Sequence, residues 1–164
     1  MAFTVNWRRD SFGPHHLFSG ALLGLISVAN LSALILVLKN LVADHAVANG
    51  TELLATAVVI FLTNVIVYAL WYWEIDSPGL TRTRWSIHEK DFQFPQYDRP
   101  AEFPNWQPEF GDFLYLSVTN AVNFAPADTV PLTRQVKFLM ASQSLISVFT
   151  LALLVARSVS ILGA

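Results

Sequence analysis

The residues best suited to chemistry lie in a short segment that has a polar residue at each end and follows an apolar run. The segment begins at Asn123, ends at Asp128 and holds four residues between them, Phe124, Ala125, Pro126 and Ala127. An amide donates and accepts hydrogen bonds, a ring of Phe side chains forms a hydrophobic constriction, and a ring of carboxylates attracts cations. If several copies of the chain surrounded an axis, these groups and the preceding Asn120 would line a pore.

Asp128 also has a structural explanation. Arg134 and Lys137 follow closely, and either cation could pair with the carboxylate. The carboxylate could also cap or brace the loop without meeting an ion. Replacing Asp128 by Asn separates these roles, because the change would reduce cation flux through a pore but would chiefly destabilise a braced loop.

A second polar group lies early in the last apolar segment and consists of Ser142, Gln143 and Ser144. These side chains give the segment a face that could meet water, and we predict that they face the pore. A polar surface of a neighbouring protein would satisfy the same groups.

The sequence offers little to an enzyme, a cofactor or a nucleic acid. No metalloprotease, nucleophile-elbow or phosphate-loop motif is present, and the four histidines are scattered, at His15, His16, His45 and His88. The absence of cysteine excludes disulfides and thiolate metal sites. The net charge is −2 and there are no basic tracts, which argues against a nucleic-acid partner. We therefore predict no enzymatic activity, no metal and no cofactor.

The composition indicates a membrane environment. Of the 164 residues, 54% are hydrophobic and 13% are charged, whereas a soluble domain carries about 25% charged residues. The apolar residues gather in three runs, at about 17–38, 53–73 and 136–162. About 22 helical residues extend about 33 Å, which is enough to cross the hydrocarbon core. The sequence therefore predicts an integral membrane protein with three transmembrane helices and lipid as a partner.

Residues 111–122 form a further apolar segment that is only about half as long as a span. Gly111 and Asp112 suit a helix N-terminus, while Pro126 and Pro131 prevent the helix from continuing. A run of about 10–14 apolar residues is typical of an interfacial or re-entrant helix. Non-helical backbone at membrane depth survives only where protein or water surrounds it. We expect a re-entrant half-helix followed by a pore loop.

These elements divide the chain into two parts. Residues 1–52 hold the N-terminal flank and the first transmembrane helix, and residues 53–164 form a pore-like module. The module has an outer helix at 53–73, an ordered surface loop at 74–110, the half-helix at 111–122, a filter-like loop at 123–133 and an inner helix at 134–162. The surface loop is expected to be ordered because it is too aromatic for a disordered linker.

The segment DFLYLSVTNAVNFAPADTVPLT resembles the pore region of the two-helix potassium-channel module. Ser117 and Asp128 match that layout, as do the residues of the following turn, Val130, Pro131, Leu132 and Thr133. Over about residues 53–162 the chain resembles more closely an uncharacterised family of bacterial membrane proteins, a domain of unknown function, through VYALWYW, DFLYLS and NFAPAD. The resemblance implies an all-α membrane protein with a potassium-channel-like pore module. It also implies a homotetramer in the bacterial inner (plasma) membrane, with ions in its pore.

The filter positions differ from those of potassium channels. A potassium filter needs glycines, whose unusual dihedral angles point successive carbonyls at the axis. Here Ala125 and Ala127 take those places, and Pro126 between them fixes φ near about −65°. We therefore expect a channel-like protein whose pore loop lacks potassium selectivity. Two other roles stay open, a sealed pore and a non-conducting structural or accessory membrane subunit.

The positive charges predict an orientation in the membrane. Eight of the ten Lys and Arg residues fall before the first span, or between or beside the second and third, and the other two are Lys39 and Arg157. The positive-inside rule therefore places the N-terminus and the 74–134 segment in the cytoplasm. Potassium channels carry their pore loop outside, so the resemblance implies an inverted module.

Overall fold

A computed structural model describes residues 14–42, 50–76, 90–123 and 128–162 of the chain. Its four α-helices are α1 (Pro14–Val42), α2 (Gly50–Asp76), α3 (Phe110–Asn123) and α4 (Arg134–Leu162). Two short strands, β1 (Phe92–Gln93) and β2 (Val130–Pro131), and a 3-10 helix at Pro95–Asp98 complete the described elements. Four of the filter-like positions, 124–127, lie outside the described residues.

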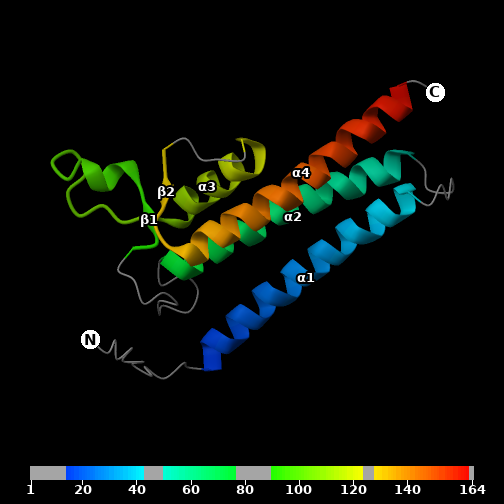
Figure 1. The fold of residues 1–164 in the computed structure, drawn as a ribbon. Helices are drawn as coiled ribbons and strands as arrows, with labels where there is room; N and C mark the ends of the chain where they lie inside the picture. Colours follow the sequence, from blue (N-terminus) through cyan, green and yellow to red (C-terminus); the bar gives the residue numbers. More distant parts are fainter. Residues whose placement is uncertain (1–13, 43–49, 77–89, 124–127, 163–164) are drawn as a thin grey trace, which may run out of the picture.

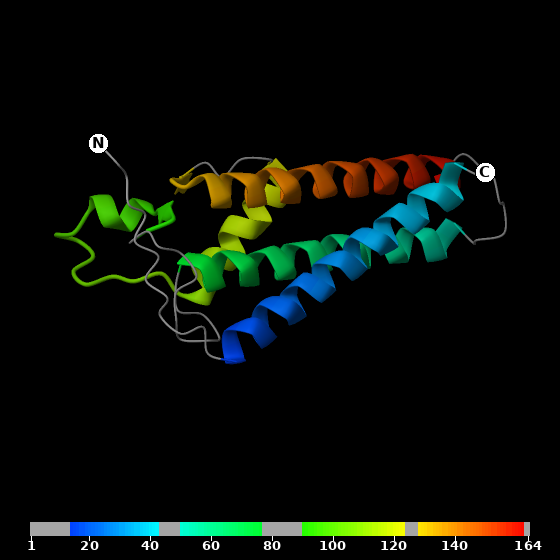
Figure 2. The same ribbon diagram turned by 60° about the horizontal axis from the view of Figure 1, so that its bottom comes forward.

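The three long helices lie side by side, and α2 runs opposite to both α1 and α4 (Figures 1 and 2). The short α3 lies beside one half of α2 and α4, near the end where α2 finishes and α4 begins. β1, β2 and the 3-10 helix gather at that same end, on which α1 also begins.

Three helices are long and apolar enough to cross a membrane. The qualifying segments are Phe18–Lys39, Leu54–Asp76 and Arg134–Ala156, of 22, 23 and 23 residues. Within lipid every backbone N–H and C=O must be paired inside the segment, so an apolar run of this length folds as a helix. Their length and composition indicate an integral membrane protein, as the sequence predicted.

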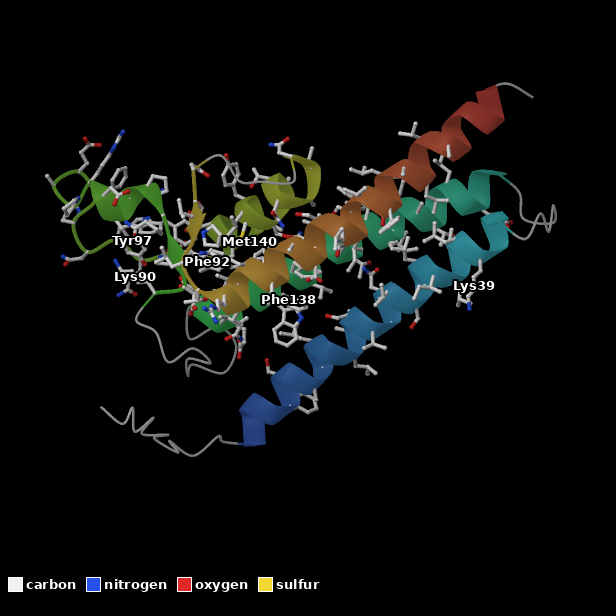
Figure 3. All side chains as sticks on the ribbon, in the orientation of Figure 1. Lys39, Lys90, Phe92, Tyr97, Phe138 and Met140 are labelled. Carbon is white, nitrogen blue, oxygen red and sulfur yellow. The ribbon has the colours of Figure 1, made fainter. Side chains whose placement is uncertain are left out.

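Large apolar side chains point outward from all three long helices. The most exposed include Phe138 (75%), Leu25 (67%) and Val155 (64%), and Figure 3 shows the position of Phe138 on α4. Such exposure is costly in water but is expected of a surface that faces lipid or another apolar protein.

The first three helices extend slightly beyond their predicted bounds, whereas α4 has the bounds predicted for the inner helix, 134–162. The second helix was expected at 53–73 and reaches from Gly50 to Asp76, while the half-helix gains one residue at each end. At the C-terminal end of α2, the Asp76 Oδ1 accepts hydrogen bonds from the backbone nitrogens of Asp91 (2.6 Å) and Phe92 (3.2 Å). These bonds fix the end of α2 against the chain that follows it.

Residues 90–109 form an aromatic cap over the end of α2 and the start of α3. Phe92, Phe94 and Phe113 are at most 4% exposed, and the rings of Phe94 and Phe113 meet edge to face with centroids 5.5 Å apart. The Lys90 Nζ lies 3.4 Å from the centre of the Tyr97 ring, and Figure 3 shows this pair in the cap, at the opposite end from Lys39. Burial of these rings orders a segment that has little regular secondary structure.

β1 and β2 tie the cap to the start of α4. The strands pair antiparallel, with Phe92 opposite Pro131 and Gln93 opposite Val130. The all-helical prediction did not include this pair, because two-residue strands leave no alternating pattern in the sequence. Its consequence is that the segment entering α4 is fixed to the cap.

Candidate functional site

The half-helix α3 begins beside the end of α2. The Asp112 Oδ2 accepts a hydrogen bond from the Glu109 backbone nitrogen (2.7 Å), and the Asp112 nitrogen donates to the Glu109 carbonyl (3.0 Å). This reciprocal pair satisfies a backbone donor that the first turn would otherwise leave unpaired. The Phe110 ring meets the Trp73 ring with centroids 5.3 Å apart. The sequence placed the N-terminus of this helix correctly to within one or two residues.

From that start α3 runs to the middle of the neighbouring spans. The Ser117 hydroxyl donates to the Val65 carbonyl at 2.7 Å, and Ser117 is fully buried. Val65 lies halfway along the Leu54–Asp76 span. The distal half of α3 therefore lies at the depth of the centre of α2.

Gln143 of α4 is the centre of a buried hydrogen-bond network that holds α3. Its Oε1 accepts from the Tyr72 hydroxyl (2.6 Å) and from the Asn120 Nδ2 (2.8 Å). Its Nε2 donates to the Ser117 carbonyl (3.0 Å) and hydroxyl (2.6 Å). All four side chains are at most 1% exposed. This Gln143 network joins α2, α3 and α4, and both ends of the Gln143 amide are satisfied within one chain.

Asn120 extends the network toward the end of α3. Its Nδ2 also donates to the Met140 carbonyl (3.0 Å), and its Oδ1 accepts from the Ser144 hydroxyl (3.3 Å). The Asn120 side chain thus connects the last turn of α3 to two successive turns of α4. The predicted pore residue Asn120 lies inside the subunit, 1% exposed.

The three consecutive polar residues of α4 have different surroundings. Gln143 is fully buried in its network, the Ser142 hydroxyl lies 2.8 Å from the Tyr68 hydroxyl, and Ser144 is half-buried against Asn120. Successive residues of an α-helix are about 100° apart, so three in a row cannot share one face. In the described structure these side chains connect helices of one chain and do not form a single exposed polar surface.

Asn123 and Asp128, at the two ends of the filter-like loop, are exposed. Among the described residues, Asp128 forms no ion pair with Arg134 or Lys137, which are themselves exposed. Pairing of Asp128 with these cations, one of the alternatives that the sequence left open, is therefore not seen among the described residues. Phe124, Ala125, Pro126 and Ala127 lie outside the described residues.

The segment that leads from the loop into α4 is hydrogen-bonded to the cap. The Leu132 nitrogen donates to the Asp91 carbonyl (2.9 Å), and the Thr133 hydroxyl donates to the Asp91 Oδ1 (2.6 Å). Asp91 is fully buried, although its second carboxylate oxygen has no hydrogen-bond partner among the described residues. Thus both sides of the loop, the end of α3 and the start of α4, are held by buried hydrogen bonds.

Sequence reasoning missed the partners that hold the half-helix. Tyr72, near the end of the second predicted span, was not among the candidate residues, yet it is fully buried and its hydroxyl donates a hydrogen bond to Gln143. A further hydrogen bond joins two polar residues in the middle of their spans, from the Asn64 Nδ2 to the Ser147 hydroxyl at 2.9 Å. Polar residues in spans rarely face lipid, so the sequence indicates that these side chains have protein partners. It does not show which residue is the partner of which.

Among the described residues there is no group of three or more His, Asp or Glu side chains placed to hold a metal ion. No family model, curated protein or solved structure matches this chain. The resemblance to the potassium-channel module and to the bacterial membrane-protein family therefore rests on the sequence motifs alone.

Proposed function

We propose that the chain is a channel-like protein of the bacterial inner membrane, in which α3 is a re-entrant half-helix and residues 123–133 form a pore loop. The observation that carries the proposal is the Ser117–Val65 hydrogen bond. This bond brings the distal half of α3 beside the centre of the α2 span, while the chain that leaves the loop returns to the cap through Leu132 and Thr133.

A half-helix that ends inside the bilayer favours assembly of several copies. The last carbonyls of α3 have no helical partners, and lipid offers no hydrogen-bond donors to them. In a single chain Asn123 and Asp128 are exposed. A homotetramer that encloses a water-filled axis would satisfy these groups, since irregular backbone at membrane depth needs protein or water around it.

The charges of the loop favour cations. The C-terminal end of a helix carries a partial negative charge, and Asp128 adds a full one at the other end of the loop. The residues between them include no glycine, so the carbonyl stack of a potassium filter is not expected. The proposed pore passes cations without potassium selectivity.

A second candidate function is a non-conducting accessory subunit. The Gln143 network favours this function, because the side chains of Ser142, Gln143 and Ser144 form their hydrogen bonds within the chain. The outward face of α4 instead presents apolar side chains, such as Phe138, Leu145 and Phe149. Such a face could dock on a larger membrane complex with no water path.

A flux assay on purified protein in liposomes separates the two functions. We expect cation flux from the native chain, and several-fold less from Asp128→Asn, since the ring of charge is removed. The matched control is Glu102→Gln, which neutralises an exposed acid of the cap that pairs with Arg99 and should leave flux unchanged. Equal flux from empty and protein-bearing liposomes would favour the accessory subunit.

A further inference from the structure

The exposed side chains of α4 lie along one face of the helix. They recur every three or four residues, and residues at that spacing share a face. Figure 3 shows one of them, Phe138, near the start of α4. The exposed residues of this face that carry the argument are Arg134, Lys137, Phe138, Ala141, Leu145 and Phe149. No element of the described structure covers the face.

The first turn of this face carries two cations. Arg134 and Lys137 are exposed, and neither forms an ion pair among the described residues. Side chains three positions apart on a helix have Cβ atoms about 5–6 Å apart, so both cations can contact one small anionic group. Arg134 is also the first residue of the Arg134–Ala156 span. The pair therefore lies at the membrane–water interface, at the level of the lipid headgroups.

Beyond the cations the same face is apolar. From residue 138 to residue 155 every exposed side chain of α4 is Phe, Ala, Leu or Val. The distance along the helix from Phe138 to Phe149 is about 16 Å, which is about the depth of one leaflet, since the hydrocarbon core is about 30 Å thick. An acyl chain whose headgroup lies at the two cations can therefore contact this apolar stripe along its length.

The charge of the face determines which occupant fits it. A zwitterionic headgroup brings a cation of its own, which offsets the attraction of its phosphate to Arg134 and Lys137, whereas an anionic headgroup has no such opposition. A second copy of the chain fits less well. Copies in one membrane share their orientation, so packing through the same face would bring the two pairs of like charges together.

We propose that this face of α4 binds an anionic phospholipid from the leaflet on the cap side. The headgroup phosphate accepts hydrogen bonds from Arg134 and Lys137, and one acyl chain lies along the stripe formed by Phe138, Ala141 and Leu145. The site requires that α4 spans a membrane, but it does not use the half-helix or the proposed pore. Ion flux and the number of subunits therefore do not bear on it.

Photolabelling of the full chain in phosphatidylcholine liposomes tests the site. A trace of phosphatidylglycerol with a diazirine midway along one acyl chain is the probe, and phosphatidylcholine with the same acyl chain is its matched partner. Labelling at Ala141 and Leu145, located by mass spectrometry, is divided by labelling at Leu22 and Leu25, which are exposed on α1 in the same half of the bundle. We expect this ratio to be about tenfold higher for phosphatidylglycerol, which corresponds to about 1.4 kcal/mol.

Paired variants test whether the two cations cause the preference. Arg134→Gln combined with Lys137→Gln should make the two ratios equal, while Arg134→Lys combined with Lys137→Arg should keep the preference because both charges remain. Lys39→Gln combined with Arg99→Gln is the matched control, since it removes two exposed cations elsewhere and should also keep the preference. A single symmetric gel-filtration peak confirms that each variant is folded.

Two results would overturn the proposal. Equal ratios for the two probes in the native chain would mean that Arg134 and Lys137 only anchor the helix at the interface. Absence of labelling at Ala141 and Leu145 by either probe would mean that a second copy of the chain, and not lipid, covers the stripe.

Discussion

At the scale of single residues, buried amides and hydroxyls determine where the half-helix lies. Gln143 makes four hydrogen bonds to three residues on two other helices, and one of the four is to the Ser117 backbone carbonyl. In hydrocarbon the alternative to these bonds is an unsatisfied polar group, since no water is present to replace them. The sequence predicted that Gln143 faces the pore, whereas its buried amide is hydrogen-bonded to α2 and α3 within the chain.

The first prediction concerns this residue. Gln143→Leu leaves Tyr72, Asn120 and Ser117 without their central partner, and we expect it to lower the free energy of unfolding by about 2–4 kcal/mol. Ser144→Ala is the matched control, because it removes hydrogen bonds no shorter than 3.3 Å from the same turn of the helix. Its cost should stay below about 1 kcal/mol.

Denaturant unfolding in detergent micelles, followed by circular dichroism, measures both variants. If Gln143→Leu were no more destabilising than Ser144→Ala, the network would not hold the half-helix in place.

At the scale of elements, α3 could be predicted from the sequence but its contacts could not. The apolar run between a Gly-Asp start and two downstream prolines gave bounds within one residue of Phe110–Asn123. The bond from Ser117 to Val65 joins residues 52 positions apart, and no local pattern records such a pair. The β1–β2 pair was missed for a related reason, since it depends on the cap and the start of α4 meeting in space.

The second prediction concerns the exposed face of α3. Tyr115, Val118 and Val122 are 55%, 42% and 50% exposed and follow one another at helical spacing. In the proposed oligomer this face meets neighbouring copies. The native chain has no cysteine, so Val118→Cys introduces a single thiol, and we expect a short bismaleimide to cross-link it to a second copy in membranes.

Val59→Cys is the matched control, because this residue of α2 is 61% exposed on a span expected to face lipid. It should cross-link at least about fivefold less, because no second copy is held next to it and the effective concentration of a second thiol is low. Equal cross-linking of the two thiols on a denaturing gel would contradict the assignment of the α3 face.

At the scale of the whole molecule, three spans followed directly from the sequence, and the described residues contain three helices that are long and apolar enough to cross a membrane. How the spans associate did not follow, because the bond between Asn64 and Ser147 and the crossing of α1 over α2 depend on long-range packing. The starts of α1 and α4 and the cap lie at one end of the bundle (Figure 1). Three spans then place the end of α4 on the opposite side of the membrane.

The third prediction is the direction of insertion. The positive-inside rule places the cap in the cytoplasm, since eight of the ten cations lie on its side. We expect alkaline phosphatase fused after residue 164 to be active in bacterial cells, because that enzyme works only when exported. A green fluorescent protein at the same position should be dark. The reverse pattern would place the pore loop outside, as in potassium channels.

The proposed pore requires a ring of identical subunits around one axis. Native mass spectrometry of the purified chain, released from detergent under gentle conditions, counts those subunits directly. We predict four copies of the 18.3 kDa chain. A monomer that persists across several mild detergents and in lipid nanodiscs would contradict the proposed pore, since no axis would then exist for Asn123 and Asp128 to line.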